Sequence, residues 1–132
     1  MRVAVVFLLA LWAWSATAQQ GWTSIVANLR AAEPAVRDAL LDNNVEELRS
    51  QSRSLLRLSM EARDLPAPES KIVGRVACVN ALAVLITVAQ NGRPTSESER
   101  NEFLRWVDHW VVHMDKCEEE FLGAAQPRSL HR

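Results

Sequence analysis

The chain has 132 residues, 48% of them hydrophobic, with 15 basic and 16 acidic side chains. This length suits one globular domain, because a second hydrophobic core would need a longer chain. The near-zero net charge excludes a strongly cationic nucleic-acid-binding protein, and the presence of only four glycines and five prolines argues against a disordered or fibrous chain.

The first 18 residues have the three parts of a secretory signal peptide. Met1-Arg2 precedes an apolar run over residues 3–12, and Ala16-Thr17-Ala18 supplies the small residues expected at a cleavage site. The run is shorter than the roughly 20 residues that a membrane-spanning helix needs. We therefore predict cleavage after Ala18 and a secreted or periplasmic protein with no membrane span once the signal is removed.

Beyond the signal peptide, helical periodicity begins at Trp22. From there to Leu40 apolar residues recur mostly at three- and four-residue steps, which predicts a helix buried on one side. Pro34 interrupts this segment, and because proline lacks a backbone donor and clashes with the preceding turn, we expect a kink or a split there. A second helix is expected up to about Arg63, with Asn43 and Glu46 at capping-box spacing before it.

The third helix, expected from about Ser70 to Gln90, differs in kind. No residue between Val76 and Ala89 is charged, so this helix should be central or lie at an interface. A fourth helix, Glu97 to about Leu122, follows a second capping box formed by Ser96 and Glu99. Its apolar positions form one stripe along the helix: Phe103, Trp106, Val107, Trp110, Met114, Cys117 and Phe121.

Four helices joined by short connections predict an all-α, up-down four-helix bundle with a kinked or split first helix. The expected parts are a signal peptide over residues 1–18, a helical bundle domain over residues 19–123 and a flexible C-terminal tail over residues 124–132.

The two cysteines, Cys78 and Cys117, are predicted to form an intramolecular disulfide, because an exported chain meets an oxidising compartment. Cys117 lies farther than Cys78 from the connection between the third and fourth helices. The bond therefore requires the fourth helix to overhang the third by about two turns. Residues 96–102 contain no apolar side chain, which permits this overhang.

Histidines on the fourth helix offer a candidate metal site. His109, His113 and Cys117 follow one another at four-residue steps, and histidines at this spacing can bind one zinc ion. The alternative is that both histidines flank the buried stripe while Cys117 belongs to the disulfide. No catalytic motif accompanies these residues, so the sequence predicts neither an enzyme nor a cofactor.

An arginine row on the second helix suits an anionic partner. Arg49, Arg53 and Arg57 lie on one helical face at four-residue steps, where they could meet a carboxylate or phosphate group. The alternative is a solvated face neutralised by Glu46 and Glu61, which flank the row at helical spacing.

On the third helix, an isolated asparagine lies among small apolar residues, as in a close helix–helix contact whose register the asparagine fixes. The alternative is an exposed face, or a face covered by the N-terminal segment. A homodimer is one form that the contact could take. The candidate interface consists of Val76, Asn80, Ala83, Val84 and Thr87.

The layout of signal peptide, four helices and proline-containing connection resembles that of periplasmic cytochromes of the c-prime type. Cys117 and Phe121 match the end of their haem-attachment motif, C-x-x-C-H-x-x-F/Y. Met114 and Glu118 stand where the first haem-linking cysteine and the histidine ligand would be. The resemblance therefore implies the bundle and not covalently attached haem.

By elimination of chemistry, the sequence favours an exported, non-enzymatic helical bundle that acts through protein–protein contact, as an inhibitor, immunity-type or adaptor protein. The sequence does not identify the partner. The alternative is a periplasmic bundle that binds metal or haem through His109 and His113.

Overall fold

The computed structural model describes residues 2–123, with side chains from residue 16 onward, so the tail predicted over residues 124–132 lies outside the described residues. The elements, in chain order, are the helices α1 (Arg2–Leu41) and α2 (Val45–Asp64), the short 3₁₀ helix η1 (Glu69–Lys71), and the helices α3 (Ile72–Asn91) and α4 (Glu97–Leu122). The predicted all-α four-helix fold is confirmed.

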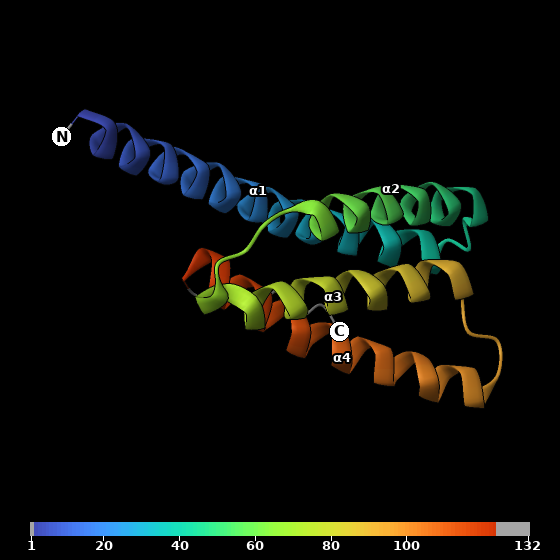
Figure 1. Ribbon diagram of the computed structural model, residues 1–132. Helices are drawn as coiled ribbons and strands as arrows, with labels where there is room; N and C mark the ends of the chain where they lie inside the picture. Colours follow the sequence, from blue (N-terminus) through green and yellow to red (C-terminus); the bar gives the residue numbers. More distant parts are fainter. Residues whose placement is uncertain (1, 124–132) are drawn as a thin grey trace.

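The four helices form an up-down bundle in which α3 is central. Helix α3 packs against each of the other three helices, and α1 likewise contacts α2, α3 and α4. The N-terminal part of α1 projects beyond the rest of the bundle (Figure 1). Residues Glu69–Asn91 are long and apolar enough to cross a membrane, and 56% of their most apolar window is buried in the bundle, as expected of a central helix.

Helix α1 runs without interruption through Pro34, so the predicted split is wrong. Leu29 before the proline and Val36 after it are both buried in the same core, together with Leu40. The apolar stripe thus keeps one register on both sides of Pro34. Burial of that stripe outweighs the lost backbone hydrogen bond in deciding whether the helix continues.

The helix caps follow local sequence. Ser96 and Glu99 form the predicted capping box of α4, and Glu99 Oε2 also accepts hydrogen bonds from the backbone and hydroxyl of Thr95. These bonds from Thr95, followed by the bond from the Ser96 backbone, lower the pKa of Glu99 below its usual value. At α2 the cap is Asn44, whose side chain accepts from the Glu47 amide at 3.1 Å, one residue beyond the predicted position at Asn43.

Cys78 and Cys117 form the predicted disulfide, with a Cα–Cα separation of 4.8 Å. Figure 1 shows α3 and α4 well apart at their connection and close together at the opposite end, where the disulfide lies. Residues 96–102, the first turns of α4, are all exposed. This exposure agrees with the overhang that the sequence predicts, and the divergence of the two helices adds to it.

Near the disulfide, the helices approach so closely at Gly74 that α3 has no room for a side chain. A Cβ atom at Gly74 would collide with Glu120 Cβ and would lie 2.9 Å from Glu120 Cγ and 3.1 Å from Phe121 Cε2. Lys71 holds Glu120 in place, because its Nζ donates to the Glu120 carbonyl at 2.6 Å.

Three elements meet around Phe121 at this end of the bundle. The rings of Trp22 and Phe121 stack with centroids 4.8 Å apart, and Trp22 Nε1 donates to the Pro66 carbonyl at 2.9 Å. Gln19 Nε2 donates to the Phe121 carbonyl at 3.0 Å. These contacts join α1, the connection before α3 and the end of α4.

One charged side chain lies inside this packing. The side chain of Glu118 is 1% exposed, and its Oε1 lies 3.7 Å from Nε of Arg30, which remains 42% exposed. A buried carboxylate needs such a partner, because an unpaired charge in the interior is costly.

At the other end of the bundle, α4 is less covered than its periodicity predicts. Trp110, Met114, Cys117 and Phe121 are buried, whereas Val107 is exposed, and Phe103 and Trp106 are half-buried. Trp106 Nε1 has no hydrogen-bond partner within the part of the chain that the structure describes.

Reduction of the disulfide should lower the free energy of unfolding by roughly 3–4 kcal/mol, because the bond closes a loop with a sequence separation of 39 residues. Urea denaturation of the oxidised and the reduced protein measures this difference. The variant Cys78→Ala/Cys117→Ala is the control, since reductant should not change it. Two free thiols in the exported protein, detected by non-reducing mass spectrometry, would contradict the bond.

The substitution Gly74→Ala should destabilise the protein by about 1–3 kcal/mol, because Glu120 Cβ adjoins the backbone and cannot rotate away. Gly21→Ala in α1 is the matched control. There the added atom meets the end of the Leu65 side chain, 2.7 Å from Cδ1, which can rotate. Higher helix propensity, worth about 0.5–1 kcal/mol, offsets part of that cost. Equal losses of stability in urea denaturation would show that the contact at Gly74 has no special effect.

Candidate functional site

The structure divides the predicted arginine row between two cavities. Arg49, Arg53 and Arg57 are all exposed on α2. Arg57 lines a cavity between α1 and α2, whereas Arg49 and Arg53 line a second cavity where α2 passes the end of α3. The three side chains therefore do not act as one patch.

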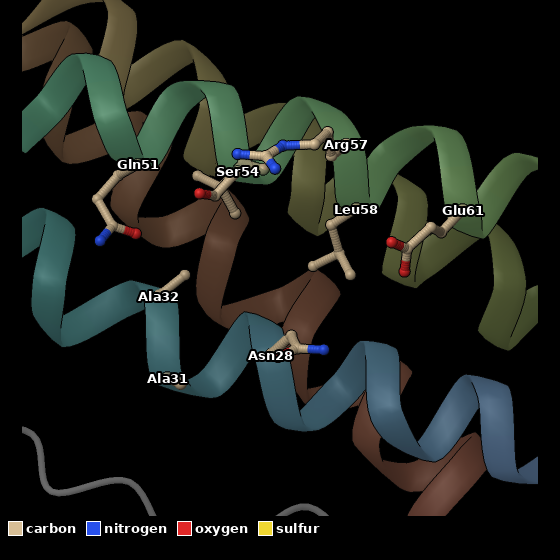
Figure 2. Close-up of a pocket in the computed structure, with 9 residues that line it drawn as sticks. Asn28, Ala31, Ala32, Gln51, Ser54, Arg57, Leu58 and Glu61 are labelled. Carbon is tan, nitrogen blue, oxygen red and sulfur yellow. The ribbon is translucent and has the colours of Figure 1, made fainter.

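The cavity between α1 and α2 measures about 430 Å³. Figure 2 shows Gln51 and Leu58 pointing from α2 toward α1, where Ala31 and Ala32 leave space opposite them. Arg57 and Glu61 both line this cavity, so its charges are balanced. Such a mixed lining provides no preference for a ligand of one charge.

The second cavity measures about 550 Å³ and has a different character. We name it the arginine pocket. Its third arginine, Arg93, comes from the connection between α3 and α4 and was not predicted from the sequence. The arginine pocket is lined by Asn43, Val45, Leu48, Arg49, Ser52, Arg53, Ala89, Gln90, Asn91, Gly92 and Arg93.

Arg93 could have been found from topology. Because α2 and α3 are consecutive antiparallel helices, the first turns of α2 lie beside the last turn of α3. Residue 93 follows that last turn directly, so it lies at the same end of the bundle as Arg49.

The predicted neutralisation of the row by Glu46 and Glu61 is not observed. Within residues 16–123, whose side chains are described, no ion pair involves Arg49, Arg53 or Arg93. These arginines therefore keep their full capacity to bind an anion.

The outward face of α3 carries the candidate interface, with one correction. Val76 is 52% exposed, Ala83 is exposed, and Asn80 and Thr87 are half-buried. Val84, however, is 5% exposed and belongs to the core, so its inclusion in the interface was wrong. The exposed arc is displaced around the helix toward Val79, because the packing of α3 in the bundle covers Val84.

With this correction the apolar face extends along most of α3. Thr87 Oγ1 donates to the Ala83 carbonyl at 2.8 Å, so its hydroxyl is already bonded within the helix. We define the α3 face as Ile72, Val73, Val76, Val79, Asn80, Ala83 and Thr87.

The histidine pair lies on α4 outside the core. The imidazole rings of His109 and His113 are nearly parallel, with centroids 6.1 Å apart, and Trp106 lies beside His109. Cys117 is bonded to Cys78 and is not available as a third ligand. The described residues contain no group of three or more His, Cys, Asp or Glu side chains that could hold a metal ion.

Both residues that carry the resemblance to c-prime cytochromes have structural partners. Cys117 is in the disulfide, and Phe121 stacks on Trp22.

No protein-family model, no curated protein and no solved structure matches the chain. Its function is therefore argued from its own residues.

The variant His109→Gln/His113→Gln should change the free energy of unfolding by less than about 1 kcal/mol, as is usual for residues outside the core. Metal analysis should find no stoichiometric metal in either protein, provided both are purified without chelator or affinity tag. Metal that is present in the wild type and lost from the variant, together with a large loss of stability, would establish the histidine pair as a metal site.

Proposed function

We propose that this protein is an exported, non-enzymatic helical bundle that acts through protein–protein contact, and that the α3 face is its contact surface. The observation that supports this proposal is the exposure of an uncharged, apolar helix face on a bundle whose other three helices already cover the opposite side of α3. Contiguous apolar surface of this kind marks interaction sites in monomeric bundles.

The chemistry of the α3 face suits close helix packing. Its apolar side chains are isoleucine, valine and alanine, which are short and lose little conformational freedom on burial. Asn80 is the polar group near the middle of the face. A buried asparagine favours a partner that pairs with it, and so fixes the register of the two helices.

A second copy of the chain is the partner that we favour. An uncharged strip has no electrostatic repulsion against its own copy. About a twofold axis, each Asn80 can also meet its counterpart. A dimer would bury the exposed valines, of which Val73 is 59% exposed.

Export is supported by two features. Residues 1–18 have the composition of a signal peptide. The Cys78–Cys117 disulfide is compatible with an oxidising compartment outside the cytosol.

The purified mature protein should be a dimer, and Ala83→Glu should convert it to a monomer, because the new carboxylate would be buried without a partner. Sedimentation velocity over a range of concentrations measures the change. Val112→Glu is the matched control, since Val112 is an exposed valine on α4 outside the α3 face. A wild-type protein that stays monomeric at high concentration, or a control that dissociates equally, would contradict self-association through α3.

A further inference from the structure

The arginine pocket combines positive charge with the absence of any acidic wall. Three guanidinium groups line it, from Arg49, Arg53 and Arg93, and none of its lining residues is an aspartate or glutamate. This concentration of charge is local, because the whole chain has a formal net charge of −1. A concave surface lined by one sign of charge attracts ions of the opposite sign.

Polar groups beside the arginines can complete an anion site. Ser52 is 8% exposed, and its hydroxyl makes no hydrogen bond to any residue of the described part of the chain. A buried hydroxyl without a protein partner is a donor in need of an acceptor. The side-chain amides of Asn43 and Asn91 also line the pocket and offer further donors.

The remaining wall is apolar. Val45, Leu48 and Ala89 line the pocket opposite no charge of their own, and Leu48 and Ala89 belong to the buried core. A volume of about 550 Å³ lies within the usual range for pockets that hold small molecules.

We propose that the arginine pocket binds a small organic anion through phosphate or carboxylate oxygens. Guanidinium groups match such oxygens in pairs, and three of them suit a ligand with two or three negative charges. Arg49 and Arg53 bind from α2 and Arg93 from the connection after α3, so the anion joins two segments distant in sequence. This site is independent of the α3 face, and neither proposal requires the other.

Amide chemical shifts in a ¹⁵N-labelled sample test the site directly, with sodium phosphate and sodium citrate as separate probes. Each titration is compared with sodium chloride at equal ionic strength, so that unspecific screening is subtracted. Saturable shifts confined to residues 43–53 and 89–93 are the expected result with at least one probe. The probe that binds more tightly identifies the anion chemistry.

Matched variants separate the pocket from the general charge of α2. Arg53→Gln and Arg93→Gln should each weaken binding by about tenfold, the loss expected for a charged hydrogen-bonding group. Arg57→Gln removes the same charge from the same arginine row but lies in the other cavity, so it should change affinity less than about twofold. All three side chains are exposed, and far-UV circular dichroism checks that the fold is kept.

Three results would overturn the proposal. The first is the absence of saturable shifts with both probes. The second is an equal loss of affinity in Arg57→Gln and Arg53→Gln, which would indicate diffuse attraction to the whole row. The third is binding only to vesicles that contain phosphatidylglycerol, which would assign the arginines to a membrane surface.

Discussion

The covalent bond between Cys78 and Cys117 sets the height at which α3 and α4 meet, and the packing at that end depends on it. Gly74 and Glu120 come into contact one turn beyond the bond, and Phe121 is thereby brought onto Trp22 of α1. With these positions fixed, the remaining length of α4 diverges from α3 toward their connection (Figure 1). One end of the bundle is therefore dense and the other is open.

Periodicity predicted the helices well because it reports which face of a helix turns inward. It does not report how far along its length a helix is covered. The stripe on α4 was correct at Met114 and Phe121 but overestimated the burial of Val107, since the neighbouring helices diverge there. Val84 shows the same limit around the helix axis, because tertiary packing determines which edge of an apolar helix is covered. At Pro34 a local rule was overridden by the continuous core on either side.

The candidate site was predictable only in part, for a similar reason. Arg49 and Arg53 share a helix face, and their spacing alone brings them together. Arg57 follows the same spacing, yet it lies over α1 and lines a different cavity. Arg93 has no periodic relation to the row, since it comes from a connection between other helices. A pocket built from two distant segments depends on topology, which spacing within one helix cannot encode.

The aromatic residues have a spectroscopic consequence. The chain contains five tryptophans and no tyrosine, so its near-ultraviolet absorption and emission come almost entirely from indole. Without residues 1–18, the indoles that remain are those of residues 22, 106 and 110. Trp22 is stacked at the dense end, whereas Trp106 is half-buried at the open end with an unbonded Nε1. Loosening at either end therefore alters the surroundings of a different native chromophore, with no label attached to the protein.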